Sequence, residues 1–325
     1  MQPAIAVRGL RKAFGAQTVL DGINFEVAAG SVFALLGENG AGKTTTINIL
    51  TTLIRPTSGS ATVAGADVVK QPGKVRKRIG LSGQFAAVDE NLTGFENLDM
   101  IGRLYRLGRD NSRVRARELL ERFDLTEAGD RPVKTYSGGM RRRLDLAGAI
   151  VAEPPVLFLD EPTTGLDPRS RTEMWGVIRD LVGKGTTLLL TTQYLEEADQ
   201  LADDIVVIDH GRQIAHGTAD ELKAMIGGER IEVTVTSVDS VTGAAEILAR
   251  FSGGDVQINE RSRKLIAPMS GGSAEFRHVL RDLEEAGIAV YDVGMRRPTL
   301  DDVFLTLTGD VAESEPDSRA ATVGV

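Results

Sequence analysis

The segment 37–44 contains the residues with the clearest capacity for chemistry. It reads GENGAGKT and fits the pattern G-x-x-x-x-G-K-[ST]. Glycines let the backbone curl so that N–H groups point at phosphate oxygens, Lys43 adds positive charge at the β- and γ-phosphates, and the Thr44 hydroxyl can bind magnesium. The apolar run before the segment and the helical spacing after it argue against a chance match. The residues expected to bind ATP with Mg²⁺ are Gly37, Glu38, Asn39, Gly40, Ala41, Gly42, Lys43, Thr44 and Thr45.

Two adjacent carboxylates follow the apolar run VLFLD at 156–160. Asp160 ends the run and Glu161 follows it, so a buried strand would deliver both acids at its carboxyl end. Asp160 would hold magnesium, directly or through water, and Glu161 would orient or deprotonate the attacking water. Taken alone, the pair fits an acidic start of a surface loop equally well. The phosphate loop upstream favours the interpretation as a metal and base site.

A third candidate is the segment YSGGMR at 136–141. Ser137, Gly138 and Gly139 precede a helical pattern, so their N–H groups and the serine hydroxyl would form a second anion-binding helix terminus. By itself this triplet fits an ordinary turn before a helix. The order of phosphate loop, S-G-G and apolar strand ending in Asp-Glu-Pro is more specific. Over residues 4–222 it resembles the ATP-binding cassette (ABC) ATPases.

The resemblance implies that two cassettes pair head to tail. Each ATP would lie between one chain's phosphate loop and Ser137, Gly138 and Gly139 of a second copy, so it implies a homodimer with two composite sites. It also implies that Phe14 stacks on adenine, although Phe14 fits a half-buried strand aromatic as well. By the same resemblance Gln84 senses magnesium and couples to the transport partner, and the loop 165–167 communicates across the dimer.

Two positions depart from the family pattern. Met140 stands where the family has a glutamine, so the hydrogen bonds of that amide are lost. After the run TLLLTT, Gln193 replaces the histidine that contacts the γ-phosphate, and glutamine is neither a cation nor an acid near neutral pH. We expect Gln193 to keep the phosphate-sensing geometry and Glu161 to act as base. The expected catalytic residues are Glu161, Gln193 and Lys43, and the expected magnesium ligands are Thr44, Gln84 and Asp160.

A sheet must position these residues. Short apolar runs between turn signals predict strands of a mixed sheet within 5–35. Further buried strands are expected at 156–160, 187–192 and 204–209, and helices at 90–127, 139–153 and 172–182. Strands alternating with helices indicate an α/β domain with a largely parallel sheet. The resemblance implies a P-loop NTPase fold with a RecA-like core, a β subdomain and a helical subdomain.

A second domain is indicated where the composition changes, at residues 227–228. The order β-α-β-β-α-β that follows predicts a small α+β, ferredoxin-like domain. Its elements are expected at 231–236, 241–251, 256–269, 276–283 and 288–293, before a final helix with Leu300, Val303, Phe304 and Leu307 in its apolar face. We expect an ATPase domain over 4–226, an accessory domain over 228–309 and a disordered tail over 310–325.

Composition excludes several kinds of site. A net charge of −8 over 325 residues disfavours sequence-independent nucleic-acid binding. The absence of cysteine excludes disulfides, thiolate zinc sites and Cys nucleophiles, and three histidines leave little room for a His-rich metal site. No apolar run is long enough to span a membrane, and the N-terminus lacks a signal-peptide pattern. We therefore expect no direct membrane insertion, and membrane association only through a partner protein.

The segments TTQYLEEAD (191–199) and RRPTLDDVFLTLTG (296–309) resemble the daunorubicin-resistance-type exporter ATPases. That resemblance covers residues 1–309. It implies a cytoplasmic subunit, peripheral on the inner face of the cell membrane, that pairs with an integral-membrane permease to export hydrophobic drugs or lipids. Docking is expected between Gln84 and Leu107, where Phe85, Leu92 and Phe95 are either exposed contacts or core of the helical subdomain. The accessory domain is expected to support dimerisation or regulate turnover.

Two other functions stay open at this point. An ABC protein acting on nucleic acid or ribosomes usually has two cassettes or coiled-coil insertions, whereas this chain has one cassette, no heptad run and net acidity. A nucleotide-binding regulator without turnover would fit Gln193 and Met140, and ATPase activity separates it from an enzyme. The transported molecule is not specified, because substrate contacts belong to the membrane subunit.

The base role of Glu161 gives a first prediction. Glu161→Gln keeps the size of the side chain but removes the proton acceptor, so turnover should be abolished while ATP binding persists. Nucleotide binding and phosphate release measured on the same preparation separate the two effects. Normal turnover by this variant would show that the assignment is wrong.

Overall fold

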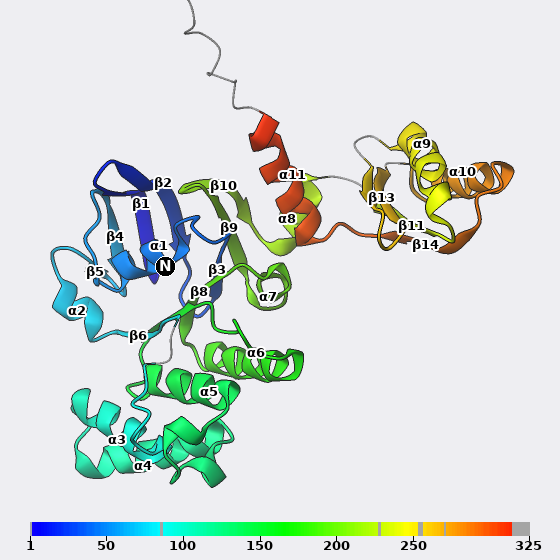
Figure 1. Cartoon of the computed structure of the whole chain (residues 1–325). Coiled ribbons are helices and arrows are strands. Elements are labelled where there is room, and N and C mark those ends of the chain that lie inside the picture. The colour runs from blue at the N-terminus through cyan, green and yellow to red at the C-terminus, as the bar shows by residue number, and fades with distance from the viewer. Residues whose placement is uncertain (1, 85–86, 227–228, 253–255, 270, 314–325) are drawn as a thin grey trace, which may run out of the picture. The chain divides into compact units, whose positions relative to one another are not determined.

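The computed structural model describes residues 2–84, 87–226, 229–252, 256–269 and 271–313 (Figure 1). By its internal contacts the chain divides into two compact units, Met1–Thr218 and Ala219–Val325. The composition change expected at residues 227–228 lies outside the described residues.

A six-stranded sheet forms the centre of the first unit, in the order β10-β9-β3-β8-β7-β6. Its strands are β3 (Val32–Leu36), β6 (Ile79–Ser82), β7 (Val156–Asp160), β8 (Thr187–Thr192), β9 (Asp204–Asp209) and β10 (Arg212–Gly217). Neighbours are parallel except β9 and β10, which are antiparallel. Every residue of β3, β7 and β8 is buried, as parallel strands covered on both faces should be.

A second, antiparallel sheet belongs to the same unit, in the order β2-β1-β4-β5. Its strands are β1 (Ile5–Phe14), β2 (Gln17–Val27), β4 (Ser58–Val63) and β5 (Ala66–Asp67). The strands expected in one mixed sheet over 5–35 are thus divided between two sheets. Burial explains the division: β1 and β2 mix buried and exposed positions, whereas β3 is buried throughout and fits an interior strand.

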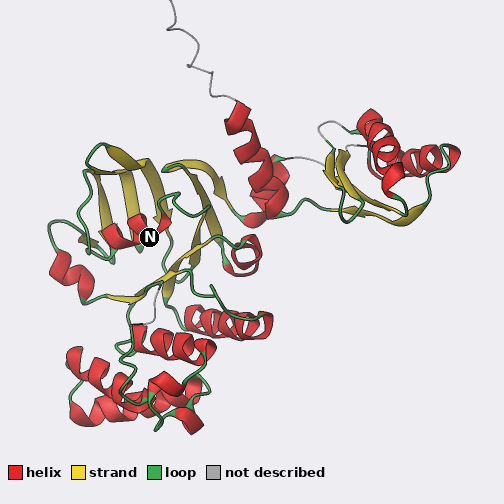
Figure 2. Ribbon diagram, viewed as in Figure 1, coloured by secondary structure: helices red, strands yellow, loops and turns green. Residues whose placement is uncertain are grey.

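Three helices gather at one end of the first unit (Figure 2) and pack against one another. They are α3 (Gly94–Leu104), α4 (Arg109–Arg122) and α5 (Gly138–Ala149). The helical segment expected over 90–127 is divided in two because Arg106 and Gly108 have φ values of 63° and 82°, which end a helix. Further helices of the unit are α2 (Pro72–Arg76), α6 (Pro168–Gly183) and α7 (Leu195–Leu201), with 3₁₀ turns at Thr126–Ala128 and Val133–Thr135.

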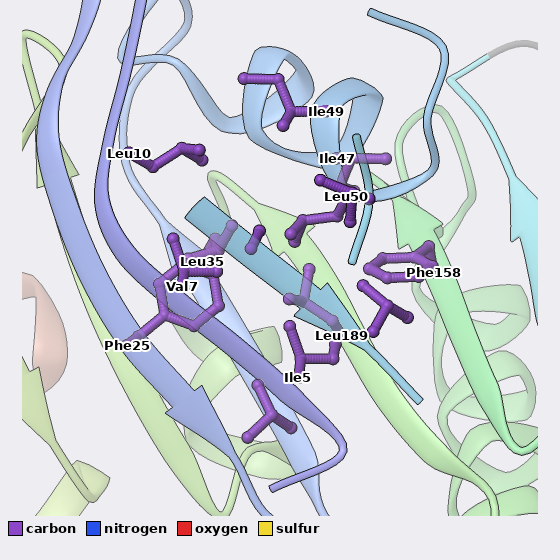
Figure 3. Packing of buried hydrophobic residues seen from close by; sticks show 14 of the residues in the cluster. Ile5, Val7, Leu10, Phe25, Leu35, Ile47, Ile49, Leu50, Phe158 and Leu189 are labelled. Carbon is purple, nitrogen blue, oxygen red and sulfur yellow. The ribbon is translucent and has the colours of Figure 1, made fainter. Parts of the chain in front are cut away.

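Side chains from both sheets and from helix α1 (Lys43–Leu50) form one core. Figure 3 shows Val7 and Phe25 of the antiparallel sheet in the same cluster as Leu189 of the parallel sheet. Ile47 of α1 lies in this cluster and is almost completely buried. Burying one side chain of this kind contributes roughly 1.5–3 kcal/mol. The core therefore fixes α1, and the loop before it, against both sheets.

The second unit contains the expected order β-α-β-β-α-β. Its elements are β11 (Glu229–Val235), a 3₁₀ turn (Val238–Ser240), α9 (Val241–Phe251), β12 (Gln257–Asn259), β13 (Lys264–Met269), α10 (Gly272–Glu285) and β14 (Val290–Arg296). The strands are antiparallel in the order β12-β13-β11-β14, which is a ferredoxin-like arrangement. A separate core includes Val233 from the sheet, Leu248 from α9 and Leu283 from α10.

Two further helices, α8 (Ala219–Met225) and α11 (Leu300–Glu313), flank the ferredoxin-like elements in the sequence and pack against each other. At the start of α11, the Arg296 Nη1 atom lies 2.6 Å from Asp302 Oδ2. Arg230 of β11 stands opposite Arg296 of β14. The segment of chain that forms this sheet therefore begins and ends on neighbouring strands. Because α11 runs to Glu313, the first residues of the tail expected over 310–325 are helical, and residues 314–325 lie outside the described part of the chain.

Candidate nucleotide-binding site

Parallel pairing brings the predicted chemistry to one edge of the six-stranded sheet. Leu36, the last residue of β3, stands opposite Thr192 of β8, and Asp160 of β7 stands opposite Thr191. The phosphate loop, the paired acids and Gln193 follow these strands directly, so they leave the sheet at adjacent points. Gln84 follows β6, the neighbour of β7, by two residues.

The phosphate loop is closed by Lys43. Its Nζ donates to the carbonyl oxygens of Gly37 at 2.7 Å and of Glu38 at 3.0 Å. A side chain at Gly37 would collide with the carbonyl of Ile208, and Gly42 has a φ of 108°, so both positions require glycine. The crest of the loop at 38–40 is exposed, which leaves its backbone N–H groups open to a phosphate.

Lys43 also meets the predicted base. Its Nζ lies 3.6 Å from Glu161 Oε1, and the two side chains are only 4% and 8% exposed. Burial lowers the pKa of Lys43, and the charge of Glu161 opposes that change by favouring the cationic form. The second Glu161 oxygen, Oε2, accepts a hydrogen bond from the Thr164 hydroxyl at 3.1 Å. The structure thus places the predicted cation and the predicted base in direct contact.

The backbone of Glu161 holds an unusual conformation, with a φ of 50°. A non-glycine residue in this region costs of order 1 kcal/mol and persists only where its surroundings hold it. Here the Glu161 N–H donates to both the carbonyl and the hydroxyl of Thr191, each at 3.1 Å. The turn therefore begins immediately after β7 and points the carboxylate back toward Lys43.

Asp160 and Thr44, two of the three predicted magnesium ligands, lie within hydrogen-bonding distance of each other. The Thr44 hydroxyl donates to Asp160 Oδ1 at 3.2 Å, and the Thr191 hydroxyl donates to the same oxygen at 2.5 Å. Mg²⁺ prefers a few hydroxyl and carboxylate oxygens together with water and phosphate oxygens. These two side chains fit that requirement. Thr191 was not singled out from the sequence, although a polar pair ending the apolar run TLLLTT was its signal.

Another buried carboxyl group stands four residues after Gln193 in the sequence. Glu197, on α7, is 0% exposed and accepts a hydrogen bond from Trp175 Nε1 at 3.2 Å. Burial raises the pKa of Glu197, partly opposed by hydrogen bonds from neighbouring side chains and by the charge of Arg171. Gln193 itself is half-buried between Thr192 and the start of α7. Sequence reasoning missed Glu197 because a glutamate in a charged helix usually faces solvent.

Other predicted residues are more exposed than Lys43, Asp160 and Glu161. Phe14 is 51% exposed, and Lys12 Nζ lies 4.6 Å from its ring centroid. Gln84 is exposed at the surface. Of the docking candidates, Leu92 and Phe95 are half-buried, with Arg117 5.7 Å from the Phe95 ring, and Phe85 lies outside the described residues.

Ser137 and Gly138 are exposed at the start of α5, and Gly139 is half-buried. The Ser137 hydroxyl accepts the N–H of Met140 at 3.2 Å and so caps its own helix. Among the described residues, no hydrogen bond or ion pair joins Ser137, Gly138 or Gly139 to the phosphate loop of the same chain. In the loop 165–167, the Asp167 carboxylate accepts the N–H of Ser170 at 3.0 Å and caps α6.

Comparison with known proteins identifies the class. The ABC transporter model matches residues 20–164, and the model for the ATP-binding protein DrrA1-3-like, C-terminal domain matches residues 217–308. The chain is 54% identical to the daunorubicin resistance ATP-binding protein DrrA2 of Streptomyces coeruleorubidus, over 98% of this chain and 99% of that protein. It is 48% identical to the daunorubicin/doxorubicin resistance ATP-binding protein DrrA of Streptomyces peucetius, over 98% and 96%. The solved structure of cbiO1 from Clostridium perfringens, described as part of the ABC transporter complex cbiONQ, is similar with a TM-score of 0.64 and 28% identity, over 69% of this chain and 92% of that one.

The match to the ABC transporter model and the similarity to cbiO1 show that this phosphate loop and these paired acids belong to an ABC-type ATPase domain. The chain belongs to the daunorubicin-resistance family of ABC transporter ATP-binding proteins. The predicted fold class and family are therefore confirmed, and the family is one of ATPases rather than of regulators without turnover. No helix in the described residues has the length and apolar character needed to cross a membrane.

The buried Glu197 generates a prediction about pH. The pKa of Glu197 in the folded protein is raised above the ordinary 4.5. The stability that the protonated side chain contributes is therefore full at pH values below the pKa of the unfolded state. It is lost as pH rises through the raised pKa of the folded state. Glu197→Gln does not ionise and can still accept from Trp175. It should therefore unfold at higher urea concentration than the wild type near neutral pH, by about 1.4 kcal/mol per pH unit of that rise.

Urea unfolding at a series of pH values measures this difference. The advantage of Glu197→Gln should shrink to nothing on acidification toward the ordinary carboxyl range. Glu196→Gln, whose parent side chain is 70% exposed, controls for the loss of one negative charge. A Glu197→Gln chain that is less stable than wild type at neutral pH would contradict the prediction.

Proposed function

We propose that two copies of this chain bind two ATP molecules with Mg²⁺ at composite sites and hydrolyse them to drive a membrane permease. The observation that carries the proposal is the division of the site. Lys43, Thr44, Asp160 and Glu161 lie together in one chain, whereas Ser137 is exposed and makes no bond to that cluster. A second copy, arranged head to tail, would supply Ser137, Gly138 and Gly139 to the open side of the phosphate loop.

The roles follow from the geometry. The phosphate-loop N–H groups and Lys43 bind the β- and γ-phosphates, which requires Lys43 Nζ to turn from the carbonyls of Gly37 and Glu38. Thr44 and Asp160 would hold the magnesium ion, with Gln84 as the third predicted ligand, and the ion would neutralise charge on the phosphates. As Lys43 moves to the phosphates, Glu161 is released to accept a proton from the attacking water.

The reaction then proceeds by in-line displacement at the γ-phosphorus. The water oxygen forms a bond to phosphorus, its proton passes to Glu161, and the bond to the β–γ bridging oxygen breaks to leave ADP. Gln193, half-buried after β8, donates a hydrogen bond to the γ-phosphate. Phe14, exposed in the antiparallel sheet, stacks on the adenine.

The permease and the cargo are proposed from relatives. Proteins named for resistance to daunorubicin and doxorubicin cover nearly all of this chain, and the solved relative cbiO1 is described as part of a transporter complex. These names support a role in drug resistance within a transporter complex. The sequence resemblance extends the proposal to export of hydrophobic drugs or lipids, by a permease that holds this chain at the inner face of the cell membrane. Acidity and the single cassette disfavour a nucleic-acid partner.

ATP-dependent dimerisation tests the composite site. The Glu161→Gln chain should elute as a monomer without nucleotide and as a dimer with ATP and Mg²⁺, measured by size-exclusion chromatography with light scattering. Adding Gly138→Asp should prevent the dimer. A Cβ at Gly138 meets nothing within 4 Å, so this change leaves the chain itself undisturbed and places a negative charge against the partner's ATP.

Gly176→Asp is the matched control. Gly176 lies in α6 and is exposed, and a Cβ added there likewise meets nothing within 4 Å, so this charge should leave the dimer intact. A Glu161→Gln chain that stays monomeric with ATP, or a dimer indifferent to Gly138→Asp, would overturn the composite site.

Co-expression tests the permease. With an integral-membrane permease of a daunorubicin-resistance exporter, the chain should move to the membrane fraction, and its ATPase rate should rise when daunorubicin is added. An unchanged distribution between membrane and supernatant would refute that partnership.

A further inference from the structure

Three consecutive arginines follow the S-G-G segment, and they have different surroundings. Arg141 pairs with Glu90 at 3.1 Å, and Arg143 reaches Asp124 at 3.6 Å, so both are held by the helical part of the unit. Arg142 is 8% exposed and turns the other way, toward the loops at the edge of the six-stranded sheet. The proposed hydrolysis steps do not use it.

The Arg142 guanidinium binds the backbone on both sides of the proposed base. Its Nη2 donates to the carbonyl of Asp160 at 2.9 Å and of Glu161 at 3.0 Å. Its Nε donates to the carbonyl of Pro162 at 2.9 Å. One rigid, planar side chain thus holds three successive carbonyl groups and with them the strained turn that aims Glu161.

The same guanidinium reaches the segment that carries Gln84. Its Nη1 donates to the carbonyl of Gly83 at 2.5 Å. One turn further along α5, Asp145 is 5% exposed and lies 3.7 Å from Arg142 Nη1. Asp145 accepts from the Ser82 hydroxyl at 2.5 Å and from the Ala87 N–H at 2.7 Å, so it holds the chain on either side of Gln84.

These contacts join two places that the proposed dimer separates. Ser137, Gly138 and Gly139 begin α5 and would contact the ATP of the partner's phosphate loop. Arg142 lies five residues after Ser137 on the same helix, about 7.5 Å along its axis. Its contacts are with Glu161 of its own chain, which serves the other ATP. A displacement of the helix start would therefore reach Glu161, the base of the opposite site.

We propose that Arg142 is a positioning residue that couples the two composite sites, by tying the helix that seats on one ATP to the backbone of Glu161 at the other. This inference rests on the proposed head-to-tail dimer. Lysine could replace the charge of Arg142 but not its fork of donors, since a single nitrogen cannot span carbonyls on two loops. A displacement of the base by about 1 Å can cost about 100-fold in rate.

Homodimers give the first measurement. Arg142→Lys and Arg142→Met should bind ATP with unchanged affinity, while kcat falls about 10- to 100-fold and the Hill coefficient for ATP falls below the wild-type value. Arg143→Met is the matched control, one residue along the same helix, and should keep the wild-type kcat and Hill coefficient. Wild-type kcat and cooperativity in both Arg142 variants would overturn the inference.

Mixed dimers give the sharper measurement, because the same two substitutions can be arranged in two ways. In the first, one chain carries Arg142→Met and the other carries Glu161→Gln, so the only intact base lacks its own Arg142. In the second, one chain carries both substitutions and the other is wild type, so the intact base keeps its Arg142. The first should be nearly inactive, and the second should turn over like a dimer of wild type with Glu161→Gln.

Equal turnover in the two arrangements would mean that Arg142 only stabilises the dimer, and it would overturn the inference while leaving the composite site intact. Failure of the Glu161→Gln chain to dimerise with ATP would instead overturn the proposed function and this inference with it. Should Arg142→Met not fold, Arg142→Lys replaces it in both arrangements, with the melting temperature and ATP binding as checks of folding.

Discussion

The hydrogen bonding between β3, β8 and β7 determines where the phosphate loop, the paired acids and Gln193 lie. Leu36 is level with Thr192, and Asp160 is level with Thr191. Parallel strands end at the same edge of a sheet, so the phosphate loop, the acids and the residue after β8 emerge side by side without any long loop to place them. Thr191 shows how tightly this edge is built, because its hydroxyl and carbonyl contact both Asp160 and Glu161.

The charged side chains at this edge of the sheet are stabilised by bonded partners rather than by contact with water. Lys43, Asp160 and Glu161 are nearly buried, and each is held by hydrogen bonds or by an opposite charge. A buried charge without such partners would be very costly. An anionic ligand that enters must therefore displace partners that these groups already have. For Lys43 these partners are two neutral carbonyl groups and one carboxylate.

Sequence reasoning reached the fold class, the phosphate loop and the paired acids because these depend on local patterns. The run VLFLD is buried at all five positions, as its composition predicts. Sequence reasoning did not identify Thr191, Glu197 or Arg142. Their importance comes from tertiary contacts between residues at least 18 positions apart in the sequence, such as Arg142 with Asp160. Three arginines in a row look equivalent in a sequence, and only the packing of α5 distinguishes them.

The assignment of 5–35 to one sheet failed for a related reason. Which sheet a strand joins is decided by what covers its two faces, and β3 differs from β1 and β2 in being buried throughout. The positive φ at Arg106, where the segment 90–127 divides, was likewise hidden, because it leaves no mark in a hydrophobic pattern. Gly108 was the readable sign of a helix end in this segment.

The ferredoxin-like elements of the second unit enter and leave on adjacent strands, with Arg230 opposite Arg296, and the helices α8 and α11 on either side of them pack together. Chain ends that meet in this way are the geometry of an inserted module. Gain, loss or exchange of that module during evolution would require a change in only one short stretch of chain on each side. The packed helices α8 and α11 would keep the two cut ends close together. A protein engineer could use the same junction to graft a reporter domain onto an ABC ATPase.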